Sequence, residues 1–181
     1  MKDAMTNTLT STLTNTVYAS SIPVFKQMLG GLSDVLNKAE AHVTEKKIVP
    51  NALLQSRLFP DMFPLLQQVQ VATDFAKSVS ARLAGVEVPK MEDTEQTFAD
   101  LQARIATVLA FINGLDAALF ADAASREIVL RAGTPKEKHL TGQAYLLSYG
   151  LPQFFFHVTT VYALLRHGGV ALGKKDFMGA Y

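Results

Sequence analysis

The sequence contains no cysteine. Disulfide bonds, thiolate nucleophiles, iron–sulfur clusters and cysteine-based zinc sites are therefore excluded. A chain without cysteine fits a reducing compartment, so we expect a cytoplasmic protein. No two histidines stand at the i, i+4 spacing that places both imidazoles on one helix face, so a strong metal-binding motif is also missing.

Long apolar runs and dense positive charge are missing too. The chain has no run of about 18 apolar residues, the length that a membrane-spanning helix requires, so we expect no association with membranes. The formal net charge is +1, and the pair Lys174 and Lys175 is too short to form a basic patch. We therefore expect no nucleic-acid partner.

The N-terminal residues 1–16 lack the apolar core of a secretory signal and are rich in Thr, Asn and Ser. We expect them to form a frayed polar lead-in to a single domain over residues 17–181. Hydrophobic residues make up 49% of the chain and charged residues 18%. This balance predicts a generous core and an apolar face reserved for a second subunit, and hence a homodimer.

Apolar residues recur at three- and four-residue steps in four segments, 24–39, 58–83, 98–112 and 144–165. This period predicts four helices with one apolar stripe each. Four such stripes bury one another most simply in a bundle. The sequence therefore predicts an all-α fold, a four-helix bundle.

Local signals suggest where the second and third helices begin. Pro60 suits the first turn of the second helix, with Asp61 beside it at the start. A short separate helix is expected just before, over residues 51–57. Asp93 with Gln96 has the spacing of a capping box, which predicts the start of the third helix.

The fourth helix carries two further signals. Thr141 is expected to cap its first turn, and Pro152 predicts a kink or break, because proline cannot donate the bond to the carbonyl of Ser148. Ahead of this helix, the segments 126–130 and 136–140 flank a Gly-Thr-Pro turn. This arrangement predicts a small β-hairpin between helices three and four.

Polar residues interrupt the apolar stripes at the edge of the expected core. Tyr149, Gln153 and His157 lie nearly on one line of the fourth helix, beside its apolar stripe. Asp61 and Gln68, one heptad apart, fall at a similar angle on the second helix. If these helices are neighbours, the two lines form a polar seam inside an apolar bundle.

His157 allows three interpretations at this stage. It is a core-edge histidine hydrogen-bonded to a carbonyl or a glutamine, a catalytic or ligand-binding group with a pKa near working pH, or a metal ligand. The adjacent run Phe154 to Phe156 is wider than one apolar stripe. It fits core packing around the kink, a pocket wall or a dimer face.

Several runs of residues together resemble a known family. They are Leu-Phe-Pro-Asp-Met at 58–62, Gln-Val-Gln at 68–70, Leu-Pro-Gln-Phe-Phe-Phe-His at 151–157 and Tyr-Ala-Leu-Leu-Arg-His-Gly-Gly-Val at 162–170. The chain resembles, over about residues 17–178, a bacterial family known only as a domain of unknown function. That family is similar to a branch of the DinB/YfiT-like superfamily of four-helix bundles.

The resemblance implies a fold, an oligomeric state and a binding site. Members of the superfamily are often dimers, and many bind a divalent metal through one histidine on helix two and two histidines four apart on helix four. Several are thiol-dependent transferases or isomerases. The matching positions in this chain are Gln68, Gln153 and His157. Amide oxygens are weak ligands for zinc or nickel, so we expect no metal or other cofactor.

Three functions remain open from the sequence. The leading hypothesis is a small molecule bound inside the bundle, with His157 as the catalytic or hydrogen-bonding group. Its predicted ligand-binding residues are Asp61, Gln68, Tyr149, Gln153, Phe154 and His157. A second is a metal- or thiol-dependent transferase or isomerase that recruits Asp61 in an altered ligand set. A third is a non-catalytic structural or interaction protein, in which the polar seam is a satisfied core network.

Overall fold

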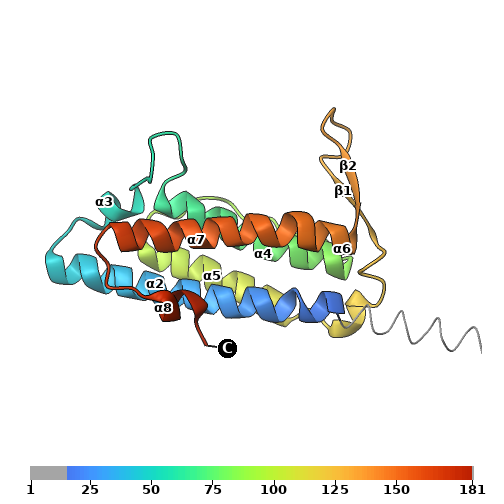
Figure 1. Cartoon of the computed structure of the whole chain (residues 1–181), viewed down its shortest axis with the longest axis horizontal. Helices are drawn as coiled ribbons and strands as arrows, with labels where there is room; N and C mark the ends of the chain where they lie inside the picture. Colours follow the sequence, from blue (N-terminus) through green and yellow to red (C-terminus); the bar gives the residue numbers. More distant parts are fainter. Residues whose placement is uncertain (1–15, 181) are drawn as a thin grey trace, which may run out of the picture.

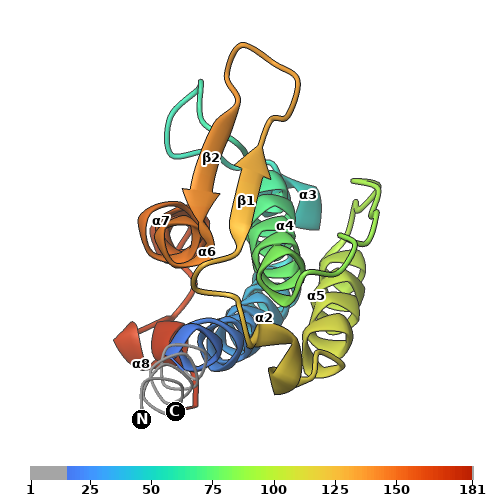
Figure 2. The same cartoon turned by 90° about the vertical axis from the view of Figure 1, so that its right-hand side faces the viewer.

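Four long helices form a bundle within residues 16–180, which the computed structural model describes. They are α2 (Ile22–Lys46), α4 (Leu65–Ala84), α5 (Phe98–Asn113) and α7 (Leu151–His167). Viewed end-on they occupy four corners, with α4 between α7 and α5, and α2 closing the ring (Figure 2). This arrangement confirms the predicted four-helix bundle. Of the polar lead-in expected at residues 1–16, residues 1–15 lie outside the described residues.

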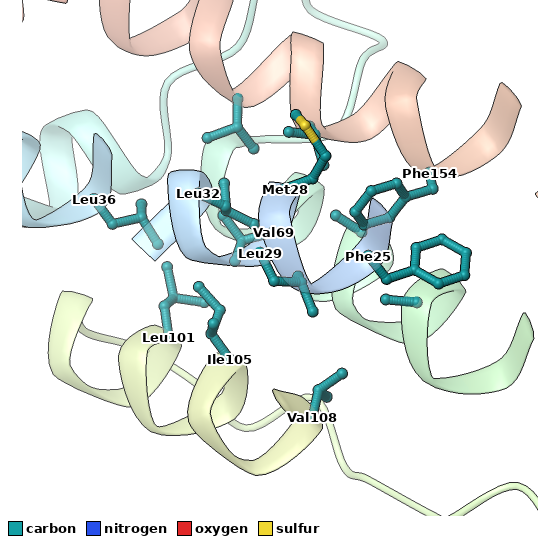
Figure 3. Close-up of a cluster of buried hydrophobic side chains, with 14 of the residues drawn as sticks. Phe25, Met28, Leu29, Leu32, Leu36, Val69, Leu101, Ile105, Val108 and Phe154 are labelled. Carbon is teal, nitrogen blue, oxygen red and sulfur yellow. The ribbon is translucent and has the colours of Figure 1, made fainter. Parts of the chain in front are cut away.

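The core lies along the shared axis of these helices, where the predicted apolar stripes meet. Leu29 and Leu32 of α2 face Leu101 and Ile105 of α5, with side chains of α4 and α7 closing the cluster from the other side (Figure 3). All four of these residues are at most 1% exposed. Burying each such side chain contributes about 1.5–3 kcal/mol, so this cluster stabilises the bundle.

Helix α4 begins later than the sequence predicts, at Leu65 instead of near Pro60. Residues 55–64 form a loop between α3 (Pro50–Leu54) and α4, and we call it the 55–64 loop (Figure 1). Pro60 and Pro64 explain the difference, because each lacks an N–H and disfavours helical geometry in the residue before it. The expected position of Asp61 on the second helix was therefore wrong, and Asp61 lies in this loop.

The start of α5 also differs from the prediction. Thr97 is its N-cap: its hydroxyl accepts a bond from the backbone N–H of Asp100 at 3.1 Å, and the Asp100 carboxylate accepts one from the N–H of Thr97 at 2.9 Å. This capping box replaces the one expected at Asp93 and Gln96. Asp93 instead forms an ion pair with Arg104.

Arg104 fixes the long connection between α4 and α5. Its guanidinium, only 2% exposed, donates to the Thr73 hydroxyl at 2.7 Å and to the carboxylates of Asp74 and Glu95 at 2.9 Å each. A buried charge without partners would cost several kcal/mol. These bonds therefore hold residue 95, at the far end of the connection, against both helices.

The predicted β-hairpin is present and consists of β1 (Glu127–Leu130) and β2 (Lys138–Thr141), paired antiparallel. It follows the short helix η1 (Ala117–Phe120) and projects from the end of the bundle opposite the 55–64 loop (Figure 1). A last helix, α8 (Lys174–Met178), crosses α2. None of the helices among residues 16–180 is long and apolar enough to cross a membrane.

The fourth predicted helix is built from three consecutive pieces. Thr141 caps α6 (Gly142–Tyr145), as expected, and the chain then passes through the π-helical turn η2 (Leu146–Gly150) into α7. In η2 the N–H of Leu151 bonds to the carbonyl of Leu146, five residues back. This wider turn places Pro152 in the first turn of α7, where proline is tolerated. The predicted irregularity is thus a π turn.

Gly150, at the end of η2, determines how closely the continuous segment α6–η2–α7 approaches α4. A Cβ at this position would lie 2.9 Å from Cγ2 and 3.1 Å from Cγ1 of Val79. Valine has little rotamer freedom in a helix, so it cannot move aside cheaply. Glycine therefore allows α4 and the start of α7 to pack directly together.

We expect Gly150→Ala to lower the free energy of unfolding by about 1–3 kcal/mol, because the new methyl group overpacks against Val79. Urea denaturation of the single and double variants measures this. In Val79→Ala the clash is relieved, so the double variant should lose less stability than the sum of the two single losses. Gly30→Ala is the matched control: a Cβ there meets nothing within 4 Å, so this helix substitution should be neutral or stabilising. Additive losses would contradict the clash.

Candidate functional site

A hydrogen bond between α4 and α7 forms the centre of the site. Nδ1 of His157, in the second turn of α7, lies 2.7 Å from Oε1 of Gln68, in the first turn of α4. Gln68 is 1% exposed and His157 is 6% exposed. The two helices therefore turn the amide and the imidazole toward each other, as the proposed polar seam requires.

The orientation of the Gln68 amide follows from a second bond. Its Nε2 lies 3.2 Å from the backbone carbonyl oxygen of Phe63 in the 55–64 loop. A carbonyl oxygen can only accept, so the amide must turn its NH2 group toward Phe63 and its oxygen toward His157. That oxygen in turn only accepts, so Nδ1 of His157 carries the hydrogen of this bond.

The imidazole is held in its neutral form with one open nitrogen. Burial lowers the pKa of His157 below its ordinary value of about 6.5. A neutral ring with hydrogen on Nδ1 has a lone pair on Nε2. No described residue hydrogen-bonds Nε2, yet no buried side-chain nitrogen or oxygen among these residues lacks a partner. Nε2 is therefore accessible to solvent as a hydrogen-bond acceptor.

Aromatic rings fix the plane of this imidazole. Phe75 of α4 stacks on it with centroids 5.9 Å apart and an interplanar angle of 15°. Phe156 of α7 contacts it edge-on at 5.2 Å. Tyr149 packs against Phe75 at 5.9 Å and supports the stack from behind. These contacts restrict the ring to one orientation in which Nδ1 meets Gln68.

A hollow of about 220 Å³ lies beside His157, between the 55–64 loop, the first turn of α4 and the second turn of α7. The lining is part polar and part apolar, and it consists of Asp61, Met62, Phe63, Gln68, Phe156 and His157. Of the residues predicted from the sequence, the hollow thus brings together Asp61, Gln68 and His157. Asp61 reaches it from the loop, although it is not on the helix where it was expected.

Three other predicted ligand-binding residues lie outside this hollow. Phe154 is fully buried in the core and packs edge-on against Phe25 of α2 at 4.9 Å, so Phe156 is the aromatic wall instead. Tyr149 lies behind Phe75. Gln153 is half-buried on α7, and no described residue hydrogen-bonds its side chain. The helical period places these residues correctly around the helix axis. Which of them line the hollow depends on where the 55–64 loop and the aromatic rings of neighbouring residues lie.

Met62 and Phe63 line the hollow but were not singled out from the sequence. The signal was present: two prolines four residues apart, at 60 and 64, with apolar residues between and beside them. Such a segment is more typical of a loop than of a helix start. An exposed loop with large apolar side chains is a feature that sequence reasoning can use to find a binding site.

The donor set does not fit the three-histidine metal site that the resemblance implies. The Gln68 oxygen is engaged with Nδ1 of His157, and Gln153 is not in the lining. No group of three His, Cys, Asp or Glu residues among residues 16–180 could hold a metal ion. A metal in this hollow would find one imidazole nitrogen and one loop carboxylate, which is too few protein ligands for a structural or catalytic zinc site.

His139 offers a contrast on the surface of the hairpin. Its ring nitrogens contact Glu137 at 2.8 Å and Glu127 at 3.0 Å. Hydrogen bonds to Glu137 and Glu127 raise the pKa of His139 above its ordinary value. The pKa of His139 is therefore shifted upward from that of an unperturbed imidazole, whereas the pKa of His157 is shifted downward.

Comparisons with known proteins agree with this fold. The chain matches the model of a domain of unknown function, DUF1993, over residues 17–178. It is similar to the crystal structure of a DinB family member protein from Shewanella denitrificans, with 40% sequence identity and a TM-score of 0.86. The match covers 97% of this chain and 96% of that one. No curated protein matches the chain.

We expect an NMR titration to give a pKa for His157 below the ordinary histidine value of about 6.5, and a pKa for His139 above it. Because the folded state binds a proton at His157 less readily than the unfolded chain, the free energy of unfolding should fall as the pH drops from about 6.5 toward the lowered pKa. His139 contributes the opposite trend, so stability is best compared in a His139→Ala background. A His157 resonance that titrates above the ordinary value would contradict the neutral, buried ring.

The amide of Gln68 can be tested through the tautomer of His157. Gln68→Leu removes the acceptor of Nδ1 and the donor to the Phe63 carbonyl, so we expect a loss of about 1–3 kcal/mol in the free energy of unfolding. Nitrogen-15 NMR should show the hydrogen on Nδ1 in the wild type and a mixture in the variant. Gln67→Leu, at a neighbouring half-buried position whose side chain no described residue hydrogen-bonds, is the control. A wild-type hydrogen on Nε2 would disprove the assignment.

Proposed function

The chain belongs to the DUF1993 family, and we propose that it binds a small molecule in the hollow beside His157. The observation that carries this proposal is the state of that histidine. A neutral imidazole with its hydrogen directed to Gln68 presents a bare Nε2 to a solvent-accessible hollow. Because Nε2 is accessible to solvent, a ligand that donates a hydrogen bond can replace water as its partner.

The lining suggests how the ligand would be held. Nε2 of His157 accepts a hydrogen bond from the ligand, or its proton, while Phe156 and Met62 contact an apolar part. The volume of about 220 Å³ is below the roughly 300–1,000 Å³ of pockets for drug-sized ligands. The hollow therefore suits a small metabolite or one end of a larger one.

The proposal requires no metal. Gln68 acts by orienting His157, a role that it could not keep while its oxygen bound a metal ion. A metal- or thiol-dependent transferase would need ligands or a thiol site that the six lining residues do not provide. The remaining alternative is structural: the amide–imidazole pair then serves only to join α4 to α7, and the hollow holds water.

Subunit number and cellular location stay predictions from the sequence. A homodimer is expected from the apolar composition and the resemblance, and light scattering measures it. A cytoplasmic location is expected from the absence of cysteine. Neither is needed for the site, because all six lining residues come from one chain.

The test is ligand binding read out at His157 itself. We expect that a panel of metabolites and thiol cofactors, screened by thermal shift, contains ligands that also move the nitrogen-15 resonance of Nε2. His157→Ala should weaken binding of such a ligand about 10-fold or more, which corresponds to one lost hydrogen bond of about 1.5 kcal/mol.

His139→Ala is the control, because it removes an exposed histidine from the far end of the bundle. It should leave the affinity unchanged within about two-fold, since a distant surface substitution removes no contact with the ligand. The Nε2 resonance is measured in the wild type, so the result does not depend on how well His157→Ala folds. If no ligand moves this resonance, the structural alternative stands.

A further inference from the structure

We propose that the ligand of the hollow carries a protonated amine next to a small apolar group. This inference rests on the proposed function and specifies the chemistry of the ligand. It follows from which atoms the six lining residues leave available: the Gln68 amide and Nδ1 of His157 both bond within the protein, whereas two acceptor groups have no hydrogen-bond partner among the described residues.

The two donor groups among the lining side chains, the Gln68 amide and Nδ1 of His157, each form a hydrogen bond within the protein. Nε2 of Gln68 donates to the carbonyl of Phe63 at 3.2 Å, and Nδ1 of His157 donates to Gln68 at 2.7 Å. The second amide hydrogen of Gln68 belongs to a side chain that is only 1% exposed, so the lining offers an anionic ligand little donor capacity. The groups that remain open are acceptors: Nε2 of His157 and the carboxylate of Asp61.

An ammonium group suits such a pair of acceptors. It has three hydrogens, so it can donate to the neutral imidazole and to the carboxylate together. A bond to an ionised carboxylate is roughly twice as strong as one between neutral groups. Asp61 is exposed, so water weakens this attraction without removing it.

The apolar walls favour a cation as well. Phe63 is 44% exposed and Phe156 is 55% exposed, and both line the hollow. The face of an aromatic ring is electron-rich and attracts ammonium groups within about 6 Å of its centre. The same rings can cover an apolar group attached to the amine.

Arg57 is the cation that could reverse this preference. Its Nη1 donates to the backbone carbonyl of Met62 at 2.5 Å, so it stabilises the 55–64 loop. Arg57 is not in the lining of the hollow. Its charge reduces the local attraction for an amine, and one of its five N–H donors is used by the Met62 carbonyl.

Three probes of the same size separate charge from shape: benzylammonium, benzyl alcohol and benzoate. They present a cation, a neutral donor and an anion next to one phenyl ring. We expect NMR titrations of the full chain to give an affinity for benzylammonium about 10-fold higher than for benzyl alcohol, because a charged donor roughly doubles the bond strength. Benzoate should show no saturable shift of Nε2.

Matched variants assign the effect to the acceptors. Asp61→Asn should lower the affinity for benzylammonium about 3- to 5-fold, the range of an exposed ion pair, and leave benzyl alcohol unchanged. Asp34→Asn removes the same charge from an exposed position on α2 and should change neither. Raising the salt concentration from about 20 mM to 500 mM should weaken only the amine, because salt screens exposed charges.

Each outcome decides the proposal. Benzyl alcohol binding as tightly as benzylammonium, tighter benzoate binding, or equal losses in Asp61→Asn and Asp34→Asn would each overturn the amine preference. If none of the three probes moves Nε2 while another ligand does, the amine is again wrong and the binding site stands. If no ligand of any class moves Nε2, both proposals fail together.

Discussion

The backbone carbonyl of Phe63 accepts a hydrogen bond from Gln68, and the chemical state of the whole candidate site depends on this contact. Because the carbonyl only accepts, it fixes the direction of the amide, and the amide fixes which nitrogen of His157 carries hydrogen. Burial keeps the ring neutral by lowering its pKa. One loop carbonyl thus leaves an acceptor, and not a donor, facing the hollow.

The packing of the bundle brings the groups of this hydrogen-bond chain within bonding distance. Gly150 lets η2 lie directly against Val79, and this close approach of α7 to α4 brings Gln68 and His157 within 2.7 Å. Phe75 stacks on the imidazole and is itself backed by Tyr149. The π turn that accommodates Pro152 belongs to the same helical segment and ends at Gly150, seven residues or about two helical turns before His157. Such turns are frequent at functional sites.

Glutamine at position 68 changes the chemistry that a histidine would give there. Two histidines facing each other can share a metal ion through their lone pairs, whereas an amide and an imidazole satisfy one another directly. The pair in this chain leaves one neutral acceptor, Nε2, on a residue that lines the same hollow as Asp61. With glutamine at position 68, this part of the fold is better suited to a ligand that donates a hydrogen bond than to a metal ion.

The sequence by itself determined the helices, the hairpin and the identity of the polar seam, because apolar periodicity, the Thr141 cap and the Gly-Thr-Pro turn are local signals. It placed Gln68 and His157 on facing edges correctly, since both lie within the regular helices that the apolar period predicts. It failed at the start of α4, where the local restrictions of two prolines delay the helix to Leu65. It also failed where non-local contacts decide: Arg104 drew Asp93 away from the α5 cap, and core packing turned Phe154 inward. Only the tertiary structure decided that the 55–64 loop brings Asp61 and the Phe63 carbonyl to the seam, because that placement depends on packing between segments far apart in the chain and no periodicity encodes it.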